Sequence, residues 1–410
     1  MTHKAESGRT GVFIVGALGD IAATMIVGAL AIRHRHASPL GMVSEQAPFK
    51  PLGLVPMEEL RFGGIDVRCG KVRDTARKVG DTSRTFSRDL LDALGPALDA
   101  IDKDVHCDSL YDWNTAKPSY SNNSLTQVVD TLRDHLRLFR QHHQLDRIVV
   151  IELASVEVTT EPVIAHTQLR AFEAAVADDD RRSISPSMIR AYAAFLEDCA
   201  YVNFTPNAGA TIPALQKLAA ERQLPYYGND AKTGETLIKT VLAPMFAYRS
   251  LEVMSWEGIN MLGNNDGKAL SDPDRRMAKM HNKEEVIPKL LGYPVHSGVD
   301  INYVPSLGDW KTAWDLIHFK GFLDVPMTMQ FTWQGCDSIL AAPLVLDLVR
   351  FGDFALRNDE AGPMKHLASF FKSPHGVEEL AFIPQFEMLL RYAQEHIEHN
   401  LKDGHQKETA

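Results

Sequence analysis

The chain has 410 residues, of which 45% are hydrophobic, enough apolar material to bury one large core or two coupled ones. Its formal charge of −10 at pH 7 argues against a nucleic-acid-binding protein, because phosphate contacts normally need a basic surface. The four cysteines are scattered and the 16 histidines show no HxxxH or HExxH spacing, so we expect no disulfide framework and no metal site, and a reducing cytoplasm.

The most apolar stretch, "GVFIVGALGDIAATMIVGALAI" from Gly11 to Ile32, raises the question of a membrane anchor or a signal peptide. Its length would suffice for a spanning helix, which needs about 20 apolar residues. However, Asp20 lies near its centre, and a charge at mid-membrane costs roughly 2.5 kcal/mol or more. No small-residue cleavage site precedes the basic "RHRH" run. We therefore expect a strand and a helix of a globular fold, without a membrane partner.

The same stretch carries glycines at a spacing that suits a nucleotide-binding turn. "GVFIVGA" is typical of a strand buried on both faces of a parallel sheet, and a helix is expected from about residue 21 to residue 36. Gly16, Gly19 and Ala22 form G-x-x-G-x-x-A, a relative of the dinucleotide fingerprint, in which glycines let the backbone approach a pyrophosphate at a helix N-terminus. A tight turn without a ligand explains these glycines equally well.

Strands and helices keep alternating up to about residue 245. "SLTQVVDTLRDHLRLFR" places its apolar residues on one helical face, and the apolar strand "DRIVVIELAS" follows. "SISPSMIRAYAAFLEDCA" predicts a helix with Ser185 as N-cap and Pro186 at its first position, before the strand "YVNFTP". "GATIPALQKLAAERQ" and "LPYYGND" repeat the pattern. The alternation predicts a Rossmann-like, doubly wound parallel sheet over residues 1–245.

A strand of different character, "VPMTMQFTWQ", predicts a second, α+β domain with a largely antiparallel sheet over residues 246–338. Its apolar residues alternate with polar ones, as in a strand with one buried face. These apolar residues are Met327, Met329, Phe331 and Trp333. Such a face suits an oligomer interface as well as a core packed by the domain's own helices. Residues 339–410 are expected to form a helical segment that returns to the first domain.

Polar residues that could carry chemistry concentrate in the second half of the chain. The loop "GNDAKTGET" offers Asp230, Lys232 and Thr233 at the edge where α/β folds bind ligands, although a capped turn would look the same. "LGNNDG" places two asparagines and an aspartate between glycines, as hairpin turns also do. In "CDSILAAPLVLDLVRF", Asp337 and Ser338 begin an apolar helix, where they suit either a cap or a cofactor contact.

Several cations stand out, because an acidic protein needs local positive charge to hold an anionic ligand. "SDPDRRMAKMHNKEEV" predicts a helix on which Arg275, Lys279 and Lys283 share one face. Like charges at this spacing destabilise a helix unless the face meets water or an anion. "GDWKTAWD" predicts Lys311 near the start of an amphipathic helix, and "FFKSPHG" places Lys372 after two aromatic residues, where desolvation lowers the pKa of an amine.

Taken together, these fragments resemble the inositol-3-phosphate synthase family, also called the myo-inositol-1-phosphate synthase family. The resemblance runs in order through most of the chain. It rests on "VFIVGALGD", "FGGIDV", "ISPSMIRAYA", "NFTPNAGATIPAL", "GNDAKTGET", "LGNNDG", "RRMAKMHNK", "VPSLGDWKTAWD", "DSILAAPLVLDLV" and "FFKSP". The "LGNNDG" match is nearly literal, and so many separate turns and caps would not fall in one family's order by chance.

The resemblance implies an isomerase, an intramolecular lyase, that uses NAD catalytically to convert D-glucose 6-phosphate to 1D-myo-inositol 3-phosphate. The implied reaction runs through oxidation at C5, enolisation by loss of a C6 proton and aldol closure onto the C1 aldehyde. The same NADH then reduces the cyclic ketone, so that no net redox change occurs. The resemblance also implies a homotetramer built on the sheet of the second domain.

By position in the matching motifs, Lys279, Lys283, Lys311 and Lys372 resemble the family's four active-site lysines, and Asp230 joins them as a catalytic residue. We predict proton transfer at the C5 hydroxyl for Lys279, phosphate binding for Lys283, and stabilisation of carbonyl and enolate oxygens for the other two lysines. The substrate-binding set adds Thr233 and Asn265 to these lysines. The predicted cofactor-binding residues are Gly16, Ala17, Leu18, Gly19, Asp20, Ile21, Asp66, Ala154, Ser155, Thr205, Asp230, Lys232, Thr233, Asn264, Asn265, Asp266, Asp337 and Ser338.

Departures from the family lie mostly at the nucleotide end. Its members commonly carry glycine or asparagine in the turn where this chain has Leu18, Asp20 and Ile21. A carboxylate beside a pyrophosphate is repulsive unless Asp20 points away to cap the helix. The family's W-T-A-N-T-E strand end is here "ELASVE". Three alternatives therefore stay open: a related sugar-phosphate cyclase, an NAD-binding homologue without catalysis, and a dehydrogenase with net redox turnover.

Overall fold

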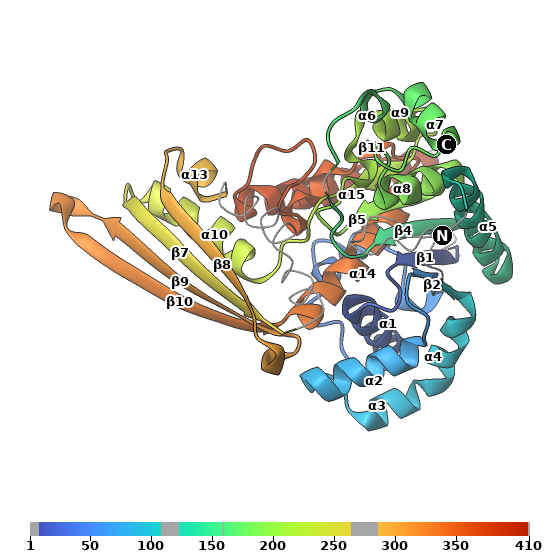
Figure 1. Ribbon diagram of the computed structural model, residues 1–410, viewed down its shortest axis with the longest axis horizontal. Coiled ribbons are helices and arrows are strands. Elements are labelled where there is room, and N and C mark those ends of the chain that lie inside the picture. The colour runs from blue at the N-terminus through green and yellow to red at the C-terminus, as the bar shows by residue number, and fades with distance from the viewer. Residues whose placement is uncertain (1–7, 108–122, 159, 264–285, 409–410) are drawn as a thin grey trace.

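Seven parallel strands form the larger of two sheets in the computed structural model, which describes residues 8–107, 123–158, 160–263 and 286–408 (Figure 1). Across this sheet the strands are β11 (Gly362–Pro363), β6 (Pro225–Tyr227), β5 (Ala200–Asn203), β4 (Arg147–Glu152), β1 (Thr10–Val15), β2 (Leu60–Asp66) and β3 (Val105–Cys107). The chain builds from β1 toward one edge and then from β4 toward the other. This reversal is a topological switch point, and α/β sheets bind ligands outside the carboxyl ends of the strands at such a point.

Helices cover both faces of the large sheet, so that its central strands are buried on each side. Successive residues of β1 point to opposite faces: Val12 and Ile14 join one core, and Phe13 and Val15 join the other. The first core contains α1 (Asp20–Arg33), α2 (Val72–Ser83), α3 (Arg88–Ala93), α4 (Gly95–Ile101), α14 (Asp337–Arg357) and α15 (Phe382–Glu408). The second contains α5 (Leu125–His143), α6 (Ile164–Thr167), α7 (Leu169–Ala177), α8 (Pro186–Leu196) and α9 (Pro213–Glu221). The predicted Rossmann-like sheet is thus confirmed.

Helix α1 is buried by a partner that comes late in the chain. It follows β1 as predicted, and residues 22–31 are buried except for Gly28. The helix packs against α14, whose Asp353 accepts hydrogen bonds from Thr10 Oγ1 and Arg147 Nε at 2.7 Å each. The apolar opening stretch therefore belongs to a protein core. Within the described ranges, no helix combines the length and apolarity needed to cross a bilayer.

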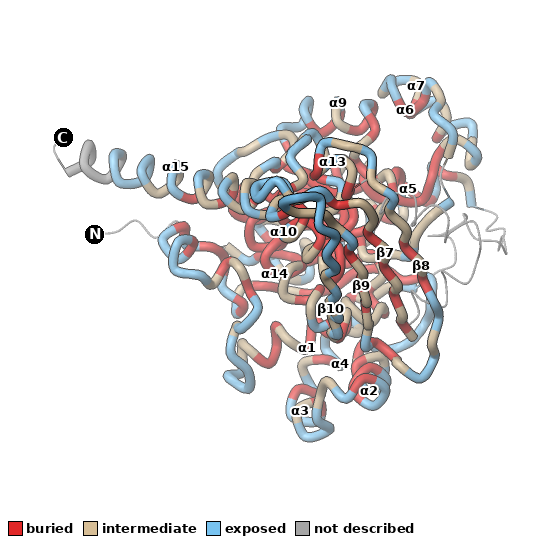
Figure 2. The backbone as a smooth tube through the Cα atoms, turned by 90° about the vertical axis from the view of Figure 1, so that its left-hand side faces the viewer, coloured by how far each residue is buried: buried red, intermediate tan, exposed pale blue. Residues whose placement is uncertain are grey.

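A second, mostly antiparallel sheet projects to one side of the first (Figure 1). Its order is β10 (Pro326–Cys336), β9 (Trp310–Lys320), β7 (Glu252–Leu262) and β8 (His296–Tyr303), and only the β7–β8 pair is parallel. Helices α10 (Gly234–Tyr248) and α13 (Val286–Leu291) pack on one face, around the buried Trp256 and Phe246. The predicted alternating strand is β10, an edge strand on which Met329, Phe331 and Trp333 are half-buried and Met327 is exposed. Figure 2 shows that much of β10 is exposed.

Short 3-10 helices connect these elements. They are η1 (Val43–Glu45), η2 (Lys50–Leu52), η3 (Met57–Glu59), η4 (Asp102–Asp104), η6 (Gly209–Thr211), η7 (Pro305–Leu307), η8 (Phe322–Asp324) and η9 (Lys365–Phe370). Of these, η4 leads into strand β3, and η9 leads into the segment that contains Lys372.

The helix predicted around Lys311 is wrong, because this residue lies on strand β9. Alternate residues of β9 are buried, but one of them is Asp315, whose carboxylate accepts a hydrogen bond from Trp256 Nε1 at 2.8 Å. Lys239 Nζ lies 3.5 Å from the same carboxylate. Because Asp315 is charged, the alternation of buried and exposed residues in β9 could not be recognised from the sequence. Its partners, Trp256 and Lys239, come from strand β7 and helix α10.

The expectation of no disulfide is also wrong. Cys69, in the loop after β2, is bonded to Cys107, the last residue of β3. The parallel pairing sets Asp66 opposite Cys107, and this brings together two cysteines that lie 38 residues apart. Cys199 and Cys336 are buried free thiols. The argument from cysteine spacing to a reducing compartment therefore loses its basis.

Removing this disulfide is expected to destabilise the large sheet's β2–β3 edge. The double variant Cys69→Ser/Cys107→Ser should lose about 2–4 kcal/mol of unfolding free energy, because an open chain of this loop length gains conformational entropy when it unfolds. Chemical denaturation with and without a thiol reductant measures this loss. Reductant should destabilise the wild type to the same extent and leave the double variant unchanged. A wild type that ignores reductant would contradict the bond.

Candidate active site

A cavity of about 460 Å³ opens at the switch point, where the loops after β1 and β4 diverge. Further walls come from the loops after β2, β5 and β6, from the start of β9, from the first turn of α14 and from the segment after η9. The predicted residues that line it are Gly16, Gly19, Asp20, Ile21, Asp66, Ala154, Ser155, Thr205, Asp230, Thr233, Lys311, Asp337 and Lys372. The cavity thus collects residues from both sheets.

The turn after β1 brings backbone close to the cavity. Gly16 has φ of +87°, and its N–H and that of Ala17 donate to the Ile65 carbonyl at 2.9 and 3.0 Å. A Cβ on Gly16 would lie 3.0 Å from the Leu153 carbonyl oxygen, and one on Gly19 would lie 3.1 Å from the Gly16 carbonyl oxygen. Both positions therefore favour glycine, since a side chain would fill the space in which the turn and the loop after β4 meet.

The carboxylate of Asp66, at the end of β2, holds the glycine turn after β1 in place. One of its carboxylate oxygens accepts the Leu18 N–H at 2.8 Å, and the other accepts the Arg68 N–H at 2.8 Å. The Arg68 guanidinium also contacts the carboxylate, with Nε at 3.1 Å. Leu18 and Ala17 are buried and do not line the cavity, so of the predicted turn residues these two shape it through the backbone.

Asp20 is the first residue of α1 and lies in the cavity wall. Burial raises the pKa of this carboxyl, and the nearby Asp309 raises it further. Asp309 precedes β9 and comes from the other sheet's side of the cavity. Two carboxyl groups therefore approach each other at the helix N-terminus, where the helix dipole and the positive charges of Lys78 and Arg68 oppose their repulsion.

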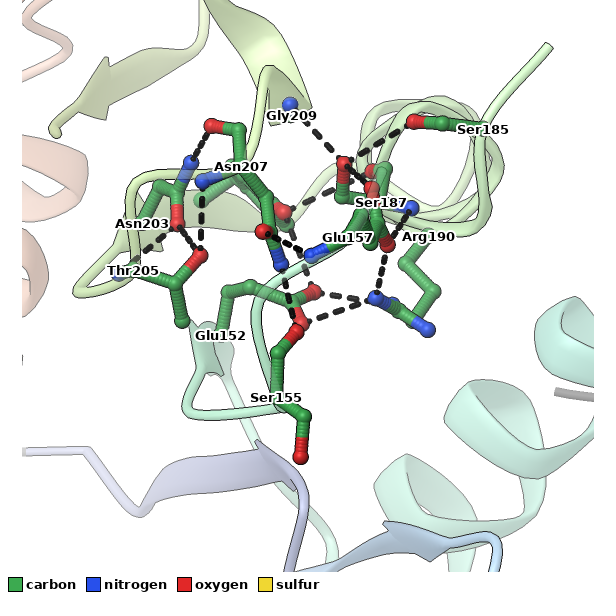
Figure 3. Close-up of polar contacts among 11 residues, drawn as sticks. Glu152, Ser155, Glu157, Ser185, Ser187, Arg190, Asn203, Thr205, Asn207 and Gly209 are labelled. Carbon is green, nitrogen blue, oxygen red and sulfur yellow. Dashed lines mark hydrogen bonds and ion pairs between the residues drawn. The ribbon is translucent and has the colours of Figure 1, made fainter. Parts of the chain in front are cut away.

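The loop after β4 is anchored by a buried ion network, drawn in Figure 3. The Arg190 guanidinium, from α8, contacts Glu152 through Nε at 2.9 Å and through Nη2 at 3.0 Å. Its Nη2 also contacts Glu157 at 2.8 Å. Burial raises the pKa of Glu152 and of Glu157, whereas burial alone would lower the pKa of Arg190 and the two carboxylates outweigh it. One guanidinium thus holds two carboxylates.

Asparagine side chains join this loop to the one after β5 (Figure 3). Asn207 Nδ2 donates to the Ser155 carbonyl at 3.1 Å, and its Oδ1 accepts the Glu157 N–H at 2.9 Å. Asn203 Oδ1 accepts both the N–H and the hydroxyl of Thr205, at 3.0 and 2.7 Å. Ser155 and Thr205 both line the cavity, and their predicted role at the cofactor stays a prediction.

A lysine from the segment after η9 and an aspartate from the loop after β6 meet in the cavity. Lys372 Nζ donates to Asp230 Oδ1 at 2.9 Å, and both side chains are mostly buried. Lys311 lines the same cavity from the start of β9. The strand is held there because Asp309 Oδ2 accepts the N–H of Ser338 at 2.9 Å and the Trp310 indole donates to the Ser83 carbonyl at 2.8 Å. Ser338 is buried and does not line the cavity; its N–H holds Asp309 in place.

Lys232 points away from the cavity, although it belongs to the same motif as Asp230. Its ammonium donates to Gln385 Oε1 and lies 5.8 Å from the centre of the Phe382 ring, both on α15. Burial lowers the pKa of this lysine to about 7, with a small opposing effect of Glu379. The structure thus places Lys232 where it ties α15 to the site, while its predicted contact with the cofactor stays a prediction.

The lowered pKa of Lys232 predicts a pH dependence of stability. Above pH 7 the folded chain holds this amine neutral while the unfolded chain still protonates it, up to about pH 10. Unfolding free energy should therefore rise with pH by about 1 kcal/mol per unit, relative to a Lys232→Met variant. Denaturant titrations at pH 7, 8 and 9 measure the difference. The exposed Lys217→Met serves as control, and parallel curves for wild type and Lys232→Met would contradict the prediction.

Five predicted residues, Asn264, Asn265, Asp266, Lys279 and Lys283, lie outside the described residues. The remaining catalytic predictions, Asp230, Lys311 and Lys372, lie in one cavity.

The sequence did not single out Arg68, Arg190 and Asp309, which also line the cavity. A signal existed for Arg190. The apolar strand "IVVIE" ends in Glu152, and a carboxylate at the end of a strand that is buried on both faces needs a positively charged partner.

Known proteins are similar to this chain over most of its length. A family model described as myo-inositol-1-phosphate synthase, of an NAD-binding type, matches residues 10–390. A relative named inositol-3-phosphate synthase 1, from Bacteroides thetaiotaomicron, is 36% identical over 396 residues, which cover 90% of each chain. One named inositol-3-phosphate synthase, from Dictyostelium discoideum, is 29% identical over 392 residues, covering 85% of this chain and 75% of the relative.

Solved structures match the fold over almost the whole chain. An inositol-3-phosphate synthase from Caenorhabditis elegans superimposes with a TM-score of 0.83 at 23% identity and covers 95% of this chain and 86% of that one. A myo-inositol-1-phosphate synthase-related protein from Thermotoga maritima gives a TM-score of 0.78 at 22% identity, covering 94% and 98%.

Proposed function

Because the chain belongs to the myo-inositol-1-phosphate synthase family, we propose that it is an NAD-dependent isomerase that converts D-glucose 6-phosphate to 1D-myo-inositol 3-phosphate. The observation that carries this proposal is that the glycine turn after β1, Lys311 and the Lys372–Asp230 pair line one cavity. The first feature suits a dinucleotide, and the second suits a substrate on which negative charge develops at oxygen.

The residues around the turn fit NAD. Gly16 and Gly19 leave room for backbone to approach a pyrophosphate, and the first turn of α1 lines the cavity through Asp20, Ile21 and Ala22. Asp66 lies at the end of β2, where an acidic residue contacts the ribose in folds of this class. NAD, when bound, would supply a hydride acceptor and donor for C5 of the sugar.

The chain's own residues would stabilise charge and move protons. The Lys372 ammonium, held by Asp230, would stabilise the oxygen on which negative charge develops during enolisation. Lys311 would do the same from the β9 side, so that the sugar lies between two cations. For Lys279 and Lys283 we propose proton transfer at the C5 hydroxyl and phosphate binding, from their positions in the family motif.

The test is to incubate the purified protein with NAD and D-glucose 6-phosphate and to assay for an alkali-stable inositol phosphate. The proposal expects product without net accumulation of NADH. Accumulating NADH would indicate a dehydrogenase, and NAD binding without turnover would indicate a non-catalytic homologue. Product from another hexose or heptose phosphate alone would indicate a related cyclase.

We also propose a homotetramer in the cytoplasm. The hairpin between β9 and β10 supports an assembly through the second sheet, since Phe322 and Leu323 at its tip are 89% and 78% exposed. Light scattering on the eluted protein tests the number of subunits. The cytoplasmic location follows from the proposed cofactor and substrate, which are held inside cells.

A further inference from the structure

Two histidines and an aspartate converge at the amino ends of the strands of the large sheet, outside the cavity. Asp104 ends η4, directly before β3, and His142 and His143 are the last two residues of α5. His142 Nδ1 lies 2.9 Å from Asp104 Oδ1, and His143 Nε2 lies 2.8 Å from Asp104 Oδ2. One ligand atom from each of the three residues lies within 4.8 Å of the others.

This spacing suits a divalent transition metal. Zinc binds histidine nitrogen and carboxylate oxygen at about 2.0–2.2 Å, so its ligand atoms lie roughly 3.3–3.5 Å apart in a tetrahedral site. Small rotations of the two imidazole rings, whose centres are 4.6 Å apart, would move the ligand atoms to that spacing. Each ring can present a lone pair at the required nitrogen by carrying its proton on the other nitrogen. The donor set of two imidazoles and one carboxylate is one that zinc and cobalt prefer.

The surroundings of the three residues favour a cation with one open position. The Asp104 side chain is only 9% exposed, so its negative charge is held in a low-dielectric place. Both histidines lie at the C-terminus of α5, where the carbonyl groups of the last turn add negative potential. The His142 side chain is 60% exposed, which leaves a side of the site open to water. His143 packs its ring edge-on against Phe139, at 5.2 Å between centres, and this fixes its orientation.

We propose that Asp104, His142 and His143 bind one divalent transition-metal ion of the zinc class, with water in the fourth position. The ion joins the C-terminus of α5 to the start of β3. Asp104 precedes a strand whose far end, Cys107, lies beside the loop of Arg68, so the ion strengthens the edge of the sheet that carries the cofactor-side loop. Its role is structural, because the three ligands lie at the amino ends of the strands and outside the cavity. This proposal does not depend on the proposed reaction.

Titration of the chelator-stripped full-length protein with Co²⁺ tests the site. The wild type should bind one equivalent and show the visible absorption of tetrahedral Co²⁺, which Zn²⁺ should displace. His142→Ala removes an exposed side chain, so the fold should persist, and it should weaken Co²⁺ binding by at least about tenfold, as expected when a direct ligand is lost. Asp104→Asn should weaken it as well. His36→Ala, at an exposed histidine after α1, is the matched control and should bind like the wild type.

Thermal unfolding gives a second readout. Zn²⁺ should raise the midpoint of the wild type and of His36→Ala by the same amount and that of His142→Ala by less, because an ion that binds only the folded state stabilises it according to its affinity. Equal Co²⁺ affinity in wild type and His142→Ala, an absorption spectrum of octahedral Co²⁺, or no binding at all would overturn the proposal. In each of these cases the three side chains form only a hydrogen-bonded cluster.

Discussion

Replacing Lys372 with alanine should lower turnover of D-glucose 6-phosphate by about 10²–10⁴-fold, the range for a lost group that moves protons or stabilises charge. The ammonium lies in the cavity with Asp230 at 2.9 Å, and no other described cation contacts that carboxylate in an ion pair. Its loss should change NAD affinity little, since the glycine turn follows β1, which is three strands away from β6, the strand before Asp230. Product assays and NAD titration, run on the same preparation, separate the two effects.

Lys365→Ala provides the matched control, because this lysine lies seven residues earlier in the chain, is exposed and does not line the cavity. Its turnover should equal that of the wild type. If Lys372→Ala kept more than about a tenth of wild-type turnover, the role assigned to this ammonium would be wrong. If NAD binding disappeared together with turnover, Lys372 would be holding the site together rather than acting on the sugar.

Replacing Arg190 with methionine should cost about 3–5 kcal/mol of unfolding free energy, which is the loss seen when one partner of a buried ion pair is removed. Glu152 is fully buried and Glu157 nearly so, and both would then lack their cation. Urea denaturation measures the change. The loop from residue 153 to residue 158 should also lose its anchoring, so NAD affinity is expected to fall in the same variant.

A charge-matched comparison distinguishes burial from mere loss of an arginine. Arg88→Met removes an arginine whose ion pair with Asp81 is exposed, and it should cost less than about 1 kcal/mol. The double variant Glu152→Leu/Arg190→Met should recover part of the loss, because Glu157 keeps its hydrogen bonds from Ser187. Equal costs for Arg190→Met and Arg88→Met would show that the network contributes nothing special to stability.

Local sequence signals were sufficient for much of the large sheet. β1 and β4 are continuous apolar runs, and α5 and α8 begin at Ser124 and Ser185, residues that favour N-caps. Each of these elements is buried on the face or faces that its own pattern indicates. The same holds for the glycine turn, because the positive φ of Gly16 is a property that the residue type itself permits.

The sequence failed where a residue's partner lies far away in the chain. Asp315 would be costly on the buried face of β9 without Trp256 and Lys239, and Cys107 could find Cys69 only through the β2–β3 pairing. Arg190 was not singled out from the sequence, because its partner Glu152 lies 38 residues away. Asp230, Lys311 and Lys372, which were predicted from family motifs, line one cavity, and their catalytic roles stay predictions.

The packing of α1 against α14 has a consequence for synthesis on the ribosome. Roughly 300 residues separate the two helices, and chains are made at roughly 5–20 residues per second. The apolar surface that α14 will cover therefore stays uncovered for on the order of 15 to 60 s after α1 emerges. During that time the nascent chain exposes the apolar helix α1 to water. A chaperone that covers residues 20–33 would prevent aggregation through this helix and so raise the yield of folded protein.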